Sequence, residues 1–146
     1  MQVRPLTVAD AEEIAPWRYP GRLAVYDVGE PVSSEVGYRA VEREGGLAGY
    51  CCFGAEARVA GVQGQQGTLD VGYGMHPDLM GNGLGRGFVA AILDAGVAEF
   101  EPNHLRLLIL DWNRRSRRVA EALGFLPEST TSNDRGTFVV MKRRAR

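Results

Sequence analysis

The stretch Gly81-Asn82-Gly83-Leu84-Gly85-Arg86-Gly87 has a glycine at every second position, between an apolar run that ends in Tyr73-Gly74-Met75 and a helical pattern that begins near Leu84. Glycine has no Cβ, so the chain here can turn tightly and present successive main-chain N–H groups. The first turn of the following helix leaves further N–H groups without partners, and its dipole favours an anion. The stretch therefore predicts a cradle for a phosphate group, with a plain strand-to-helix turn as the alternative.

The composition bounds what kind of protein this is. The chain has 146 residues, of which 45% are apolar and 24% charged, so we expect one globular domain over residues 1–146. A formal net charge of −1 offers no field for nucleic acid or an anionic membrane. No apolar run reaches membrane-spanning length, and the N-terminus lacks the apolar stretch of a signal peptide. We therefore expect a cytoplasmic protein with neither nucleic acid nor a membrane as partner.

The two cysteines, Cys51 and Cys52, are neighbours in a predicted strand. Adjacent strand residues point to opposite faces, so a disulfide between them is geometrically unfavourable. We expect small, reduced, partly buried side chains, which suits the cytoplasm. A catalytic cysteine is the alternative, although no histidine stands near in the sequence to lower a thiol pKa.

Local signals predict the elements on the N-terminal side of the glycine stretch. Thr7 and Asp10 have the spacing of a capping box, which marks the start of a helix. Gly45-Gly46 between two apolar runs is typical of a hairpin turn, and Gly72 and Gly74 inside a strand indicate a bulge or the close approach of another group. The predicted elements are a strand at Val3–Leu6, a helix at Ala9–Ala15, a short helix or turn at Leu23–Asp27, strands at Tyr38–Glu44 and Leu47–Phe53, a loop at Gly61–Gly67 and a strand at Thr68–Met75.

On the C-terminal side, helices and strands alternate. Asn113 can cap a helix that ends at Gly124. The unit from Thr68 to Leu110 should cross over right-handedly, so that its two strands pair in parallel. We thus expect an α/β (α+β) fold, with a mixed, mostly antiparallel sheet and helices on both faces. The predicted elements are a helix at Leu84–Phe100, a strand at Leu105–Leu110, a helix after Asn113, and an antiparallel pair at Phe125–Glu128 and Thr137–Lys142.

Two motifs carry a resemblance to a known family. Met80-Gly81-Asn82-Gly83-Leu84-Gly85 resembles the acyl-CoA pyrophosphate motif of the GNAT superfamily of N-acyltransferases, Gln/Arg-x-x-Gly-x-Gly/Ala. Asn113-Arg114-Arg115-Ser116 and Leu123-Gly124-Phe125 resemble features of the ribosomal-protein N-terminal acetyltransferase branch. The sequence departs from the family pattern at Met80, where Gln or Arg is usual, and at Ala120, where many members carry a tyrosine that protonates the leaving thiolate.

The resemblance implies acetyl-CoA as co-substrate and no metal. The family's fourth and fifth strands splay apart so that pantetheine inserts between them, which strands with free backbone edges allow. Main-chain amides of the glycine stretch would bind the pyrophosphate, and an N–H near Tyr73 to Met75 would stabilise the oxyanion. The cofactor-binding residues implied are Met75, Gly81, Asn82, Gly83, Leu84, Gly85, Arg86, Asn113 and Ser116.

Acyl transfer to an amine needs a base for the amine and an acid for the thiolate. Asp70 is the base candidate because it is the only carboxylate of its strand, with His76 as the alternative. By resemblance, Ser116 would lie near the thioester sulfur and act as the acid, with Tyr73 as the alternative. Each of these residues could instead have a structural role.

Other residues are candidates for substrate contacts. Asp111 could bind the acceptor ammonium, and by resemblance Trp17, Tyr19 and Tyr26 would roof the acceptor site. Cations near a helix N-terminus oppose its dipole, so an anion such as the CoA 3′-phosphate would favour them. The residues in question are Arg114, Arg115, Arg117 and Arg118, with Arg86 as an equal alternative.

The sequence thus predicts an acetyl-CoA-dependent N-acetyltransferase that works by direct transfer in a ternary complex. The acceptor would be a primary amine of a small molecule or of a protein N-terminus. A non-catalytic acyl-CoA-binding regulatory module and a nucleotide-binding protein with the same cradle are the alternatives. A homodimer is compatible with the sequence, which does not fix the oligomeric state.

Overall fold

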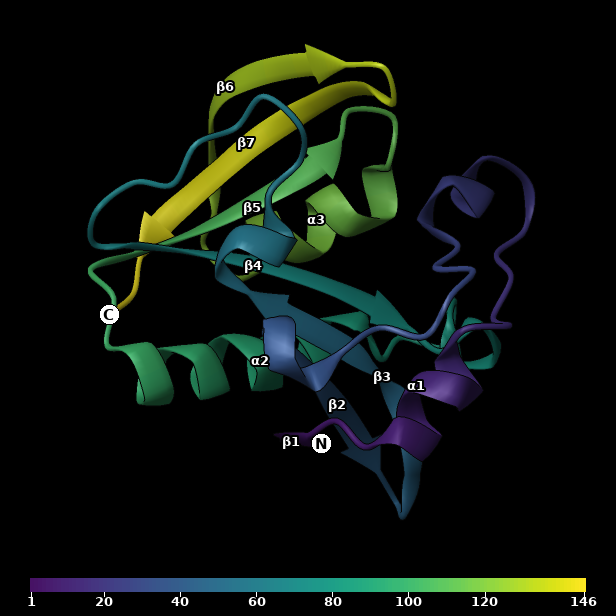
Figure 1. Ribbon diagram of the computed structural model, residues 1–146. Coiled ribbons are helices and arrows are strands. Elements are labelled where there is room, and N and C mark those ends of the chain that lie inside the picture. Colours follow the sequence, from purple (N-terminus) through teal and green to yellow (C-terminus); the bar gives the residue numbers. More distant parts are fainter.

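The structure is a computed structural model that describes residues 1–146, apart from the side chain of Ser34. In the described residues, strands form one sheet in the order β1-β2-β3-β4-β5-β7-β6. All neighbouring strands run antiparallel except β4 and β5, which are parallel. The predicted mixed, mostly antiparallel sheet is therefore confirmed (Figure 1). The strands are β1 (Gln2–Pro5), β2 (Tyr38–Arg43), β3 (Gly46–Phe53), β4 (Thr68–Met75), β5 (His104–Leu110), β6 (Leu126–Asn133) and β7 (Gly136–Arg144).

Helices pack on both faces of this sheet, as expected. The apolar faces of α2 and α3 meet one face of the strands in a core that includes Val41 and Cys51. Their strand neighbours Ala40 and Tyr50 point to the other face and pack with α1. Within the described residues, none of the helices has the length and apolar character needed to cross a membrane. The helices are α1 (Val8–Ile14), α2 (Gly85–Phe100) and α3 (Arg114–Ala122), with short 3₁₀ turns η1 (Gly21–Tyr26), η2 (Ser34–Val36), η3 (Gly54–Ala57) and η4 (Pro77–Leu79).

Most element boundaries differ from the sequence prediction by only one or two residues, and two of the differences have a clear physical reason. The β2–β3 turn is formed by Glu44 and Gly45, both at positive φ (53° and 81°), so that Gly46 already begins β3. A tight hairpin of this kind needs positive φ at both central residues, which displaces the turn by one position from Gly45-Gly46. Strand β6 extends to Asn133, five residues beyond the predicted end at Glu128. The added residues of this exposed edge strand are polar, so the sequence lacks the alternation of apolar and polar residues that would predict a strand there.

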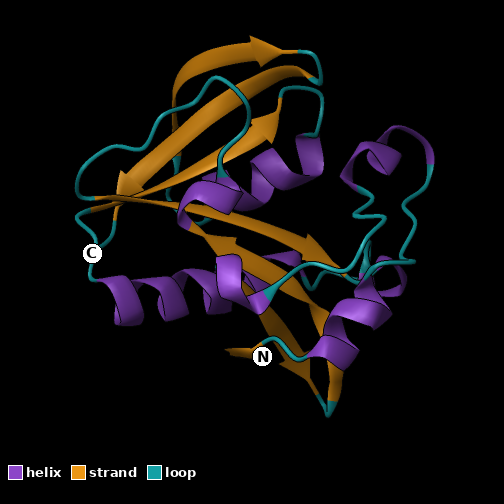
Figure 2. Ribbon diagram, in the orientation of Figure 1, coloured by secondary structure: helices purple, strands orange, loops and turns teal.

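The strands of the sheet separate into two groups. β4 and β5 pair only at their first residues, Thr68 with His104, Leu69 with Leu105 and Asp70 with Arg106. Figure 2 shows the two strands meeting at one end and diverging toward the other. The segment 58–67 arches over β5 and β7 (Figure 1), where Arg106 Nη2 donates to the main-chain carbonyl of Gln63 at 2.8 Å. The predicted splayed pair is confirmed.

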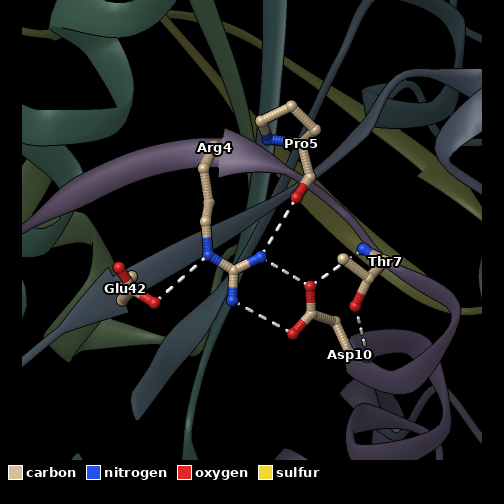
Figure 3. A network of polar contacts seen from close by, with 5 residues as sticks. All are labelled: Arg4, Pro5, Thr7, Asp10 and Glu42. Carbon is tan, nitrogen blue, oxygen red and sulfur yellow. Dashed lines mark hydrogen bonds and ion pairs between the residues drawn. The ribbon is translucent and has the colours of Figure 1, made fainter. Parts of the chain in front are cut away.

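A charged network fixes the start of α1 (Figure 3). The Asp10 main-chain N–H donates to Thr7 Oγ1 at 3.0 Å, and the Thr7 N–H donates to the Asp10 carboxylate at 2.8 Å, so the predicted capping box is confirmed. Arg4 of β1 donates to both carboxylate oxygens of Asp10, at 2.6 and 3.1 Å, and to Glu42 at 3.3 Å. Hydrogen bonding from Arg4 lowers the pKa of Asp10 from 3.8 to about 2.

This network makes a prediction for stability against pH. Because the pKa of Asp10 is lower in the folded chain, its contribution is complete above about pH 4 and is lost as the pH falls toward 2. We expect Asp10→Asn to lower the free energy of unfolding by about 1–2 kcal/mol at pH 7 and by much less near pH 2. Urea unfolding at both pH values measures this, with Glu12→Gln on the exposed side of α1 as the control. An equal loss at both pH values would contradict it.

Candidate active site

A cavity of about 590 Å³ lies where β4 and β5 part. Its walls come from the second half of β4, from Leu107 to Ile109 of β5, from the glycine stretch, and from the first turns of α2 and α3. The segment that contains η1 closes it on the side where α1 packs. The cavity therefore crosses the sheet, from the face covered by α2 and α3 toward the face covered by α1.

The main chain of both strands faces this cavity without a strand partner. His76 N–H donates to Ala48 of β3 at 2.7 Å, so by alternation the N–H groups of Met75 and Tyr73 point the other way, into the gap. On β5, Asp111 N–H donates to Thr137 of the β6–β7 side, so Leu108 turns its main-chain groups toward β4. Two strand edges thus stand open to an extended ligand.

The glycines at positions 72 and 74 of β4 are not explained by a bulge. The β3–β4 register is regular through both positions. A Cβ on Gly74 would lie 2.5 Å from the Tyr50 ring, and one on Gly72 would lie 2.9 Å from Cys52 Sγ. Side chains of β3 therefore occupy the space, and the second of the two predicted readings, close approach of another group, is the correct one.

The glycine stretch ends the cavity on the α2 side. Gly81 and Gly83 have φ of 78° and 74°, a conformation that side-chain-bearing residues rarely adopt. A Cβ on Gly83 would meet nothing within 4 Å, so the space beside this turn is open. α2 begins at Gly85, and its N-cap residue Leu84 supplies no capping side chain. The first N–H groups of the helix therefore remain available to an anion.

Most of the predicted cofactor-binding residues line the cavity. Asn82 does not, because its side chain turns back to the carbonyls of Asp78 and Met80 at 3.3 and 3.4 Å. Of the predicted arginines, Arg86 and Arg115 line the cavity, whereas Arg117 donates to the Asp111 carbonyl and the other two are exposed outside it. The predicted residues that line it are Met75, Gly81, Gly83, Leu84, Gly85, Arg86, Asn113 and Ser116.

Two hydroxyl groups meet inside the cavity. The oxygens of Tyr73 and Ser116 lie 3.2 Å apart, which brings the two predicted acid candidates together. Burial raises the pKa of Tyr73, so its phenol keeps its proton. Asn113 holds the start of α3, since its Oδ1 accepts from the Ser116 N–H at 3.2 Å, and its Nδ2 donates to Tyr26 Oη at 3.1 Å. Ala120, one turn further on, is fully buried.

The predicted base, Asp70, does not line the cavity. Its side chain is 1% exposed and points to the face of β4 opposite Tyr73. Arg106 binds it through two nitrogens, with Nη2 at 2.9 Å, and Arg58 Nε lies 2.7 Å from the same oxygen. The carboxylate is thus engaged by two guanidinium groups and does not face the cavity. The structure supports a structural role for Asp70.

Three further candidates do not reach the cavity. Trp17 packs in the core beneath α1, against Tyr50 and the ring of His76. His76 accepts the Asp78 N–H through Nδ1 and so starts η4. Asp111 is exposed, and its main chain is held by Thr137 and Arg117. Their roles are therefore packing, capping and turn formation in this structure.

Tyr19 and Tyr26, by contrast, do line the cavity. The Tyr19 hydroxyl donates to the Met75 carbonyl at 2.7 Å, which ties the roof segment to the end of β4. Sequence reasoning missed the apolar members of the wall, among them Leu23, Leu108 and Ile109. The two β5 residues belong to the apolar run at Leu105–Leu110, which the sequence shows. Leu23 lies in the short 3₁₀ turn η1, where the sequence has no periodic apolar pattern.

The cysteines are both free and buried. Burial raises the pKa of Cys51 and of Cys52 to about 12, so neither forms a thiolate readily. Neither lines the cavity. The alternative of a catalytic cysteine therefore has no support.

Comparisons with known proteins agree with this architecture. Residues 1–126 match the model of the acetyltransferase (GNAT) domain. The chain therefore belongs to the GNAT acetyltransferase family, as the glycine motif predicts. The comparisons give no support to the narrower resemblance to the ribosomal-protein branch. No curated protein sequence matched this chain.

Solved structures share the fold. The aminoglycoside acetyltransferase AAC(6')-Ib in complex with coenzyme A superposes with a TM-score of 0.79 at 18% identity, over 98% of this chain and 94% of that one. The same protein with paromomycin and acetyl-CoA gives 0.78 at 17% identity, over 98% and 92%. A chimera of the spermidine N-acetyltransferase SpeG from Vibrio cholerae with hSSAT gives 0.73 at 16% identity, over 99% and 96%. At these identities the likeness is one of fold.

The corrected role of Asp70 can be tested by stability. Removing one charge of a buried pair leaves the other without compensation, so we expect Asp70→Asn to lower the free energy of unfolding by about 3 kcal/mol or more. Arg58→Gln should cost less, because Arg106 keeps its contacts with the carboxylate and the Arg58 side chain is partly exposed. Urea unfolding measures both variants. An unchanged midpoint for Asp70→Asn would show that the ion pair does not hold the strands together.

Proposed function

We propose that this protein is an acetyl-CoA-dependent N-acetyltransferase that transfers the acetyl group directly to a primary amine. The observation that carries the proposal is the gap between β4 and β5, whose free strand edges end at an uncapped helix N-terminus. An extended ligand with amide groups and a diphosphate at one end matches both features. The family match and the similar structures that contain coenzyme A or acetyl-CoA support this choice.

The chain's own residues would hold such a ligand in two places. The main-chain N–H groups from Gly81 to Arg86 would bind the diphosphate, with the Arg86 and Arg115 side chains beside them. The N–H of Met75 or of Tyr73 would face the thioester carbonyl and stabilise negative charge on its oxygen, a contribution on the order of 3 kcal/mol. Met80, which stands where the family usually has Gln or Arg, offers no N–H donor from its side chain, so the diphosphate would depend on the main chain and these two arginines.

The thiolate that leaves must receive a proton. We propose that Ser116 and Tyr73 supply it, since their hydroxyls lie 3.2 Å apart within the cavity. Tyr73 is placed by β4 and by the edge of the Phe88 ring, and its raised pKa keeps the proton available until negative charge develops nearby. This pair would take over the role that a tyrosine at the place of Ala120 has in other members.

Removal of the amine proton falls to water in this proposal. No Asp, Glu or His of the described residues lines the cavity, so the acceptor would enter as the free amine or lose its proton to solvent. The two buried, free cysteines are compatible with a reducing compartment such as the cytoplasm. A single domain over residues 1–146 also remains a prediction.

The cofactor assignment is tested by binding. Acetyl-CoA at 100 times its dissociation constant should stabilise the protein by about 2.7 kcal/mol, while ATP and NAD should not. Gly83→Asp should weaken acetyl-CoA binding by about tenfold or more, because it places a carboxylate in the open space beside the diphosphate. Gly83→Asn is the matched control, since Asn has the same size and tolerates positive φ about as well. Stabilisation by ATP or NAD alone would overturn the assignment in favour of a nucleotide-binding protein.

The acid assignment is tested by turnover. Tyr73→Phe and Ser116→Ala should each lower kcat about 100-fold, with little change in KM for acetyl-CoA. The double variant should cost little more than the worse single one, because the two hydroxyls act as a unit. Release of free thiol gives the rates, and Ser129→Ala on the exposed edge strand is the control. A wild-type protein that binds acetyl-CoA but releases no thiol with any amine would instead indicate a non-catalytic binding module.

A further inference from the structure

The roof of the cavity presents no carboxylate among its described lining residues to the proposed amine acceptor. We call the part of the wall formed by Tyr19, Leu23, Tyr26 and Leu108 the acceptor wall, because three of these residues come from the roof segment around η1 and the fourth from β5. The wall is aromatic and aliphatic. Its two hydroxyls are engaged, Tyr19 as donor to the Met75 carbonyl and Tyr26 as acceptor from Asn113.

Carboxylates are missing from the whole cavity lining in the part of the chain that the structure describes. The roof segment contains Asp27, but its Oδ1 accepts the Tyr19 N–H at 2.9 Å, and Arg18 lies 3.9 Å from its other oxygen. Asp27 thus has its partners within the roof itself and does not line the cavity. Among the residues that the structure describes, none of those lining the cavity offers a carboxylate to a second ammonium group.

Positive charge, by contrast, flanks the roof. The guanidinium of Arg22 lies 4.3 Å from the centre of the Trp112 ring, beside the start of α3. Arg135, from the turn between β6 and β7, donates to the Val25 carbonyl of η1 at 2.6 Å. A ligand with several ammonium groups would therefore meet two guanidinium groups at the roof and an uncharged wall inside.

We propose that the acceptor is a primary amine that carries no second positive charge and whose body is apolar or aromatic. This inference rests on the proposed function and narrows its substrate class. An ammonium group buried without a partner is strongly disfavoured, whereas an alkyl or aryl body gains from contact with Leu23, Leu108 and the tyrosine rings. The expected class differs from aminoglycosides and spermidine, which carry several amines each.

A matched pair of amines tests the charge rule. Hexylamine and 1,6-diaminohexane have the same carbon chain and differ in one amino group. We expect kcat/KM to be about tenfold or more higher for hexylamine, and 2-phenylethylamine to behave like hexylamine. Equal or better use of the diamine, beyond the factor of about two that its second amine gives statistically, would overturn the inference.

A negative charge placed on the acceptor wall provides a second test of the inference. Leu23→Asp should raise the kcat/KM ratio of diamine to monoamine by about tenfold, because it supplies the missing counter-ion, while Leu23→Asn of equal size should leave the ratio near its original value. An unchanged ratio in Leu23→Asp would show that this wall does not select the acceptor.

The failure of this inference and the failure of the proposed function have different signatures. Thermal stabilisation by acetyl-CoA is measured in every variant and does not depend on the amine. If acetyl-CoA binds but neither hexylamine nor 2-phenylethylamine is acetylated or bound, the substrate class is wrong and the cofactor site stands. If acetyl-CoA does not bind, the proposed function itself fails.

Discussion

The parting of β4 and β5 after their third residue pair is the constraint on which the rest of the site depends. At that point Asp70 and Arg106 form a buried ion pair, and Arg58 ties the preceding segment to the same carboxylate. Beyond it, neither strand can satisfy its facing main-chain groups with the other. A buried strand edge is costly unless something pairs with it, so the fold leaves a place that an extended ligand can fill.

Local signals in the sequence were sufficient for most elements and for the glycine turn that leads into α2. The capping box at Thr7, the cap at Asn113 and the positive-φ glycines each act within a few residues, so their geometry can be deduced without tertiary knowledge. Asp70 failed because its partners, Arg58 and Arg106, are distant in the sequence. The two-residue period of a strand does place Asp70 and Tyr73 on opposite faces, and that signal argued against the base assignment.

The proposed proton donors differ in position from the tyrosine that many family members carry. A hydroxyl that protonates the leaving thiolate could in principle be supplied by more than one element of the fold. Here Ala120 is buried in the core, while Tyr73 from β4 reaches Ser116 from the first turn of α3. The sequence named both hydroxyls as candidates, but their proximity could not be deduced, because they stand 43 residues apart.

The absence of carboxylates from the cavity lining of the described residues links the proposed chemistry to the proposed choice of substrate. A carboxylate near the reacting amine would both attract cations and take up the amine proton. Without a carboxylate in its lining, the cavity lacks both effects. Selection then depends on desolvation, since a free amine on an apolar body enters such a site at little cost and a polycation does not. Water can accept the proton only where the roof leaves the amine in contact with solvent. Under the proposed function, the roof segment around η1 would thus act in two ways, by disfavouring a second charge and by leaving the amine in contact with water.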